Sequence, residues 1–141
     1  MDKLLNEFTV NRPIDETWSV LTDVERIAPC MPGAQLQEIE GDVYRGLVKV
    51  KLGAISTSFK GQASFTERDD DAHRAVLRIK SRDAGGQGYA NADVVFTLND
   101  GGGTIHTAAQ ISGKAASMGE GVVQTVLDAL IGDFTQKLAA I

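Results

Sequence analysis

The chain has 141 residues, of which 43% are hydrophobic and 23% are charged, and its formal net charge is −5 at pH 7. These values predict one domain, residues 1–141, with a single sizeable core, and they argue against a nucleic-acid-binding protein. Cys30 is the only cysteine, which excludes an internal disulfide framework, and no Cys/His spacing is typical of a structural zinc site. The first ten residues lack the apolar run of a signal peptide, and no stretch approaches the roughly 18 apolar residues of a membrane span, so we expect a soluble, cytoplasmic protein.

The first part of the chain predicts one strand and two short helices. Alternating apolar residues over 4–10 are typical of a half-buried strand. Pro13 suits the first helical position, and apolar residues recur at helical spacing over 14–21. A second short helix is predicted over 24–28, and Pro29 ends it.

The remainder predicts six strands and one long helix. Period-two alternation, broken at turns rich in glycine and aspartate, predicts strands over 35–40, 43–52, 55–67, 73–82, 87–98 and 104–113. After Gly113 the apolar period changes to about 3.6. The resulting stripe contains Met118, Val122, Val126, Leu130, Phe134 and Leu138, and it is widened by Val123, Leu127 and Ile131. Gly119 and Gly121 either let the start of this helix bend or approach a ligand, or the helix begins near Glu120. The fold class is therefore α+β, with a curved antiparallel sheet of about seven strands around a long C-terminal helix.

One face of the predicted sheet is built from residues too small to fill a core. Alternate positions place Gly61, Ala63, Gly88, Ala90, Ala92, Thr107 and Ala109 on this face, with larger apolar residues towards the strand ends. Because protein interiors pack as densely as organic crystals, a small-residue middle and a bulky rim predict a hollow. The candidate lining residues are Met31, Phe59, Phe65, Leu77, Ile79, Ala90, Ala92, Val94, Phe96, Ile111, Met118 and Val122.

This apolar lining favours a lipophilic ligand, such as a quinone or an isoprenoid-like molecule, over a sugar or a nucleotide. The alternative is that the terminal helix fills the space with Leu127, Leu130 and Phe134. A quinone or a lipid is thus the one bound molecule that we expect.

The positive charge of this acidic chain is concentrated in its middle. Residues 45–82 contain nine basic and four acidic residues, whereas the rest of the chain contains five and fifteen. Eight basic residues on three consecutive predicted strands are expected to point to the outer face of the sheet: Arg45, Lys49, Lys51, Lys60, Arg74, Arg78, Lys80 and Arg82. This face is a candidate contact for an acidic partner or for anionic lipid headgroups, and the alternative is a solvated face that protects the sheet. It lacks the interleaved aromatic residues that nucleic-acid binding favours.

No residue pattern indicates a catalytic or metal site. His73 has inward parity beside the turn at 69–71 and His106 has outward parity, and neither has a nucleophile nearby in the sequence. Cys30 follows a short helix, whose C-terminal end raises a thiol pKa, so we interpret it as a buried structural thiol. Glycines in the segment 85–88 resemble half of a nucleotide loop, but no helix N-terminus follows to receive a phosphate. We expect no catalytic residues, no metal and no covalently bound cofactor.

The order of one strand, two short helices, six strands and a long helix is the layout of the helix-grip fold of START and Bet v 1-like proteins. Several segments resemble the G-subunit family of carbon monoxide dehydrogenase more specifically: Phe8-Thr9-Val10, Pro13-Ile14-Asp15-Glu16-Thr17-Trp18, Leu21-Thr22-Asp23, Pro29-Cys30-Met31-Pro32-Gly33-Ala34, Val48-Lys49-Val50-Lys51-Leu52-Gly53 and Phe59-Lys60-Gly61. The resemblance covers essentially the whole chain, and the Cys-Met-Pro-Gly-Ala stretch is its most distinctive part.

This resemblance implies a non-catalytic accessory protein that associates with a molybdenum-containing carbon monoxide dehydrogenase. It also implies recruitment of that enzyme to the inner face of the cytoplasmic membrane and a lipophilic ligand, such as a quinone, in the grip cavity. Peripheral contact with an anionic membrane is therefore expected. Two other classes stay open: a ligand-free assembly or recruitment factor, and a cyclase-like or hydrolase-like enzyme of the same superfold, since a fold does not settle a function.

Overall fold

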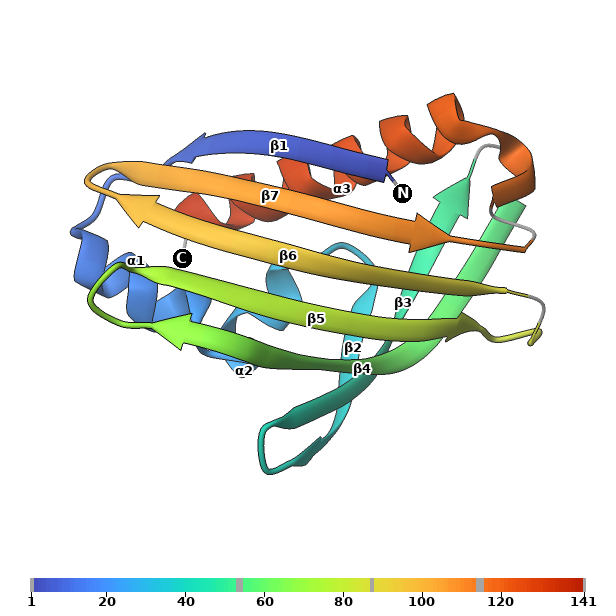
Figure 1. Ribbon diagram of the computed structural model, residues 1–141, viewed down its shortest axis with the longest axis horizontal. Coiled ribbons are helices and arrows are strands. Elements are labelled where there is room, and N and C mark those ends of the chain that lie inside the picture. Colours follow the sequence, from blue (N-terminus) through green and yellow to red (C-terminus); the bar gives the residue numbers. More distant parts are fainter. Residues whose placement is uncertain (1, 53–54, 87, 114–115, 141) are drawn as a thin grey trace.

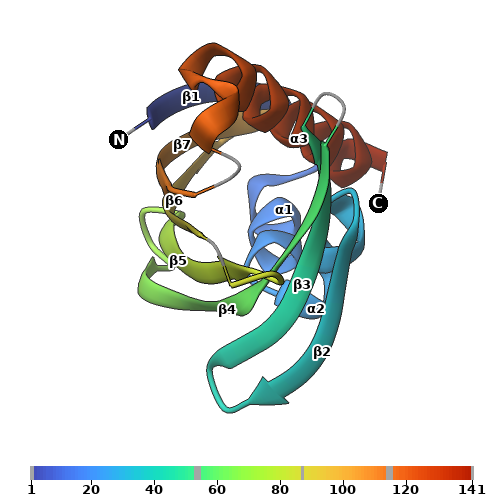
Figure 2. The same cartoon turned by 90° about the vertical axis from the view of Figure 1, so that its right-hand side faces the viewer.

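The computed structural model describes residues 2–52, 55–86, 88–113 and 116–140, and within them a seven-stranded antiparallel sheet has the order β1-β7-β6-β5-β4-β3-β2. The sheet curves, and a long helix packs across its concave side (Figures 1 and 2). The strands are β1 (Asp2–Thr9), β2 (Ala34–Glu40), β3 (Val43–Leu52), β4 (Ile55–Asp69), β5 (Arg74–Asp83), β6 (Tyr89–Asn99) and β7 (Gly102–Ile111). The helices are α1 (Ile14–Leu21), α2 (Val24–Ile27), η1 (Ala28–Cys30), η2 (Ala116–Met118) and α3 (Glu120–Ala140).

The predicted fold class is confirmed, and the differences lie at the ends of elements. β7 begins at Gly102, within the predicted turn, because Gly102 pairs with Thr9 while the turn itself is confined to the preceding residues. A side chain at Gly102 would collide with the Phe8 carbonyl oxygen, so only glycine allows this close pairing. The helix α3 begins at Glu120, as one of the two alternatives predicted.

Two glycines allow the sheet to fold over itself. β4 changes direction along its length, so that its first part runs steeply beside β3 and its second part runs with β5 (Figure 1). Gly61 lies near the middle of β4 and pairs with Gly46 of β3. A Cβ atom at Gly61 would lie 2.0 Å from the Lys80 carbonyl oxygen, and one at Gly46 would lie 2.3 Å from the Gln35 carbonyl oxygen. Because neighbouring backbones approach this closely, both positions require glycine, and the β2–β3 part of the sheet turns towards α3.

Residue size changes systematically along the concave face. Cross-strand pairing places side chains in transverse rows: Ala75, Phe96 and Ile105; then Leu77, Val94 and Thr107; then Ile79, Ala92 and Ala109; and then Ser81, Ala90 and Ile111. The first two rows pack with α1 and with the C-terminal half of α3 in the main core, which includes Trp18, Leu21, Ile131, Phe134 and Leu138. The last two rows contain small residues. We call these regions the packed end and the open end of the sheet.

Candidate functional site

A cavity of about 300 Å³ lies at the open end of the sheet. Its sheet wall is made of small residues on neighbouring strands, among them Gly46, Gly61, Ala63, Ala90, Ala92 and Ala109. Val24, Ala28 and Met31 close it on the side of the short helices, and α3 contributes Val123, Val126, Leu127 and Leu130. The space exists because glycine and alanine leave the sheet wall short of the helix. Larger side chains at its edge, Val50, Ile111 and Val126, pack against Phe59 and keep α3 from approaching the wall more closely.

Six of the predicted lining residues lie in the wall of this cavity: Met31, Phe59, Ile79, Ala90, Ala92 and Ile111. Four others lie instead in the main core at the packed end or against it: Phe65, Leu77, Val94 and Phe96. Their inward parity is as predicted, but they lie too far along their strands to reach the cavity. Val122 is 38% exposed and does not line the cavity. The side chain of Met118 lies outside the described part of the chain.

The terminal helix does not fill the hollow. Leu127 and Leu130 line the cavity, and Phe134 lies beyond it in the main core, with its ring centroid 6.4 Å from that of Phe96. Helix α3 thus covers the cavity with its first half and packs the core with its second half. The alternative in which all three residues occupy the space is wrong.

Sequence reasoning missed the wall contributed by β2, β3 and α2. Leu36, Tyr44, Val48 and Val50 line the cavity, as does Val24 of α2. Alternation could have predicted the β3 part of the wall, because the basic residues of β3 point outward and the positions between them therefore point inward. The fold of β3 over the concave face, which depends on the glycine pair, is not evident from alternation alone.

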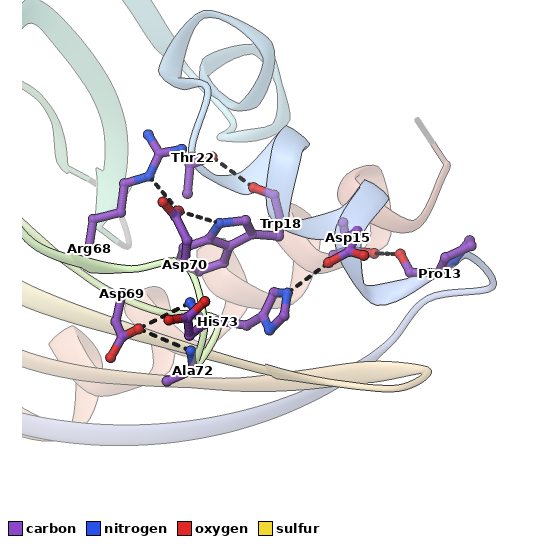
Figure 3. Close-up of polar contacts among 11 residues, drawn as sticks. Pro13, Asp15, Trp18, Thr22, Arg68, Asp69, Asp70, Ala72 and His73 are labelled. Carbon is purple, nitrogen blue, oxygen red and sulfur yellow. Dashed lines mark hydrogen bonds and ion pairs between the residues drawn. The ribbon is translucent and has the colours of Figure 1, made fainter.

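A separate polar cluster lies at the packed end, where α1 meets the turn between β4 and β5 (Figure 3). The Trp18 indole N–H donates to Asp70 Oδ1 at 2.8 Å, and Arg68 Nε donates to the same oxygen at 3.1 Å. These two hydrogen bonds lower the pKa of the Asp70 carboxyl below its ordinary value, and the bond from Trp18 has the larger effect. His73, which has φ 52°, lies 2.9 Å from Asp15 Oδ1 through Nε2, and its ring packs edge-on against Trp18.

This cluster does not make the cavity catalytic. His73 is paired with a carboxylate, as an acid–base role requires, but Asp15 is exposed and neither residue lines the cavity. His106 is exposed on the outer face. Cys30 is 3% exposed, and burial raises the pKa of its thiol. Within residues 2–52, 55–86, 88–113 and 116–140, no group of three or more His, Cys, Asp or Glu side chains could hold a metal ion.

The predicted basic face is divided into paired and unpaired residues. Arg45, Arg74 and Arg78 form ion pairs with Glu40, Glu67 and Asp93 at 3.1, 2.8 and 2.9 Å, respectively. The other predicted residues are exposed and form no ion pair with any described residue: Lys49, Lys51, Lys60, Lys80 and Arg82. We call these five residues the unpaired basic patch. Lys60 lies directly opposite Arg82 across the strand pair, and the patch covers the outside of the open end.

Comparison with solved structures shows the fold. The chain is similar to a conserved protein from Geobacillus kaustophilus, at 23% identity and a TM-score of 0.79, over 98% of this chain and 91% of that one. It is also similar to the ZhuI aromatase/cyclase from Streptomyces sp. R1128, at 16% identity and a TM-score of 0.60, over 97% and 93% of the two chains. A truncated norcoclaurine synthase from Thalictrum flavum matches at 16% identity and a TM-score of 0.58, over 97% and 92%. These similarities show the helix-grip fold of Bet v 1-like and START-like proteins.

Comparison at the level of sequence families is more specific. No curated protein matches the chain. None of the helices in the described residues is both long enough and apolar enough to span a bilayer. The family model for the carbon monoxide dehydrogenase G-subunit (CoxG) matches residues 7–140. Because this match covers nearly the whole sheet and all of α3, the chain belongs to the CoxG family.

Proposed function

We propose that the chain is an accessory protein that binds a lipophilic small molecule, such as a quinone or a lipid, in the cavity at the open end. The observation that carries this proposal is the cavity itself, with about 300 Å³ between small side chains and an apolar helix face. An apolar cavity of about 150 Å³ accepts benzene, so this volume suits a fused pair of rings. Apolar burial contributes roughly 25 cal/mol per Å² before the cost of association is subtracted.

The same proposal assigns a partner and a place. Family membership supports association with a molybdenum-containing carbon monoxide dehydrogenase, either for its recruitment to the membrane or for exchange of an electron carrier with it. The unpaired basic patch supports peripheral contact with anionic lipid, because its five charges have no acidic partner among the described residues. The patch lies on the outer side of the strands whose inner side forms the cavity, so such contact would bring the ligand site close to the lipid surface.

The test is a substitution that fills the cavity. Ala92 lies between Ile79 and Ala109 on the cavity wall. Replacing it in Ala92→Phe is expected to reduce binding of 2-methyl-1,4-naphthoquinone at least about tenfold, because the new ring occupies the ligand's volume. Equilibrium dialysis measures the affinity. Gln110→Phe is the matched control, since it adds the same ring to the exposed outer face of the neighbouring strand, and its affinity should equal that of the original chain.

Unchanged quinone affinity in folded Ala92→Phe would exclude the cavity as the binding site. The unpaired basic patch also favours a second candidate, a recruitment factor that carries no ligand. Native mass spectrometry of the purified chain distinguishes the two, because a carrier retains a quinone or lipid whereas a recruitment factor remains empty and still binds the dehydrogenase.

A further inference from the structure

The cavity wall contains very few polar side chains that face inward. Strand register places Gln35, Arg45, Gln62 and Asn91 on the outer face, although parts of them border the cavity. The contributions of α2, η1 and α3 are entirely apolar. Among the described residues, the inward-facing polar side chains of the cavity are therefore those of Tyr44 and Ser81.

The Ser81 hydroxyl already has a hydrogen-bond acceptor. Its Oγ donates to the Ala90 carbonyl oxygen at 2.5 Å, on the strand that is paired with β5. The Ser81 backbone N–H is directed to Asn91 Oδ1 at 3.3 Å. Because a hydroxyl has one hydrogen to donate, Ser81 has no donor left for a molecule in the cavity.

The Tyr44 hydroxyl is different. Tyr44 pairs with Ala63 and continues the row that contains Ile79, Ala92 and Ala109, so its side chain stands on the inner face at the cavity wall. No described residue forms a hydrogen bond with its hydroxyl, and the residue is half-buried, so that water can reach it in the empty protein. A ligand that displaces this water must provide an acceptor or leave the hydroxyl unpaired, which is unfavourable.

We infer that Tyr44 is a specificity-determining residue, whose hydroxyl donates a hydrogen bond to an oxygen of the bound molecule. The ligand class is therefore an apolar ring system that bears a carbonyl or similar acceptor oxygen, rather than a plain hydrocarbon. The oxygen lies towards the β2–β3 side, and the apolar rings lie over Ala90 and Ala92. This inference rests on the proposed function, because it describes how the same cavity selects its ligand.

The test compares two ligands with the same skeleton, 2-methyl-1,4-naphthoquinone and 2-methylnaphthalene, by equilibrium dialysis with the full chain. The original chain should bind the quinone more tightly than the hydrocarbon. Tyr44→Phe should weaken quinone binding roughly three- to tenfold, the effect of one neutral hydrogen bond, and leave hydrocarbon binding within about twofold. Tyr89→Phe is the matched control, because Tyr89 is the other tyrosine of the chain and pairs with Arg82 on the outer face. It should change neither affinity.

Infrared spectroscopy of the complex tests the inference without relying on the stability of the variant. The quinone carbonyl stretch should move to lower frequency when the original chain binds it, and the shift should be lost in Tyr44→Phe. An unshifted carbonyl band, or a Tyr44→Phe variant that keeps the full preference for the quinone, would overturn the assignment while the cavity remained the binding site. If the original chain binds neither molecule, the proposed function fails and the role of Tyr44 fails with it.

Discussion

The packed end and the open end of the sheet share the same strands, the same pairing and the same helix, yet one is solid and the other is hollow. At the packed end, Phe96 and Ile105 meet Phe134 of α3 in a core that excludes water. At the open end, Ala90 and Ala92 leave a cavity between the sheet and the first half of α3. The size of the residues along each strand thus determines where a helix-grip sheet keeps a cavity, because the backbone architecture is continuous through both regions.

The outer surfaces of the two ends differ as well. Arg74 and Arg78, towards the packed end, are neutralised by Glu67 and Asp93. Lys60 and Arg82, outside the open end, face each other without an acidic partner among the described residues. Like charges opposite one another destabilise a strand pair, and the anionic contact proposed above would relieve this repulsion. The hollow and the unpaired charge therefore occur on opposite sides of the same strands.

The largest expected effect comes from shortening leucines of α3 at the two ends. Leu138 is 0% exposed in the packed core, so Leu138→Ala should cost about 2–5 kcal/mol of the free energy of unfolding, measured by urea denaturation. Leu130→Ala removes the same atoms from the edge of an existing cavity and should cost clearly less. Equal losses in the two variants would show that the open end is as tightly packed as the other.

Adding volume sharpens the comparison in the opposite direction. Ala75 is 1% exposed and paired with Phe96, so Ala75→Phe should destabilise the fold by about 1–3 kcal/mol through overpacking. Ala92→Phe, two rows away, should cost less than about 1 kcal/mol because its ring has space. Thermal unfolding of both variants provides the measurement. A larger loss for Ala92→Phe than for Ala75→Phe would contradict the assigned positions of core and cavity.

Charge removal tests the outer surfaces. Lys60→Ser/Arg82→Ser should weaken sedimentation with phosphatidylglycerol-containing vesicles about tenfold or more, since each basic residue near such a surface contributes about 1 kcal/mol. The matched double variant Arg74→Ser/Arg78→Ser removes the same net charge from ion-paired positions and should have a much smaller effect. Binding of the original chain to purely zwitterionic vesicles, or equal losses in both doubles, would refute a specific role for the patch.

The smallest effect concerns the thiol at the packed end. Burial raises the pKa of Cys30, so the stabilisation from its neutral form is complete below the ordinary thiol pKa and is lost as the pH rises above about 8.5. The free energy of unfolding of the original chain should fall faster over this range than that of Cys30→Ala. Alkylation by iodoacetamide at pH 8 should be far slower in the folded than in the unfolded chain. Rapid labelling of the folded protein would show that this end opens readily.

Much of the fold could be predicted from the sequence because strand alternation and turn residues are local signals. The predicted inward parity of Phe65, Leu77, Val94 and Phe96 is correct. Parity cannot show how far along a strand a side chain lies relative to the helix that covers it. The prediction therefore places these four residues in the cavity wall, although they belong to the core or pack against it.

The spacing of apolar residues along α3 also failed to predict which of them face the sheet. A stripe of residues spaced by four drifts around a helix of 3.6 residues per turn, so Val122 and Leu138 differ by about 160° in direction. Leu138 is fully buried and Val122 is exposed, while Val123 faces the cavity. Tyr44 was missed for a third reason. Its position at the wall depends on the fold of β3 over the sheet, which is a tertiary property that requires the close backbone approach at Gly61.

The close approach of neighbouring backbones at Gly61 limits how the shape of the cavity can change. A side chain at Gly46 or Gly61 would collide with the backbone of the neighbouring strand, so neither position could narrow the cavity without forcing strands apart. Evolution or protein design could instead fit the cavity to a ligand of different shape by substituting the alanines on neighbouring strands. The backbone of the cavity wall is therefore fixed by the two glycines, whereas the shape of the cavity can change through its alanine side chains.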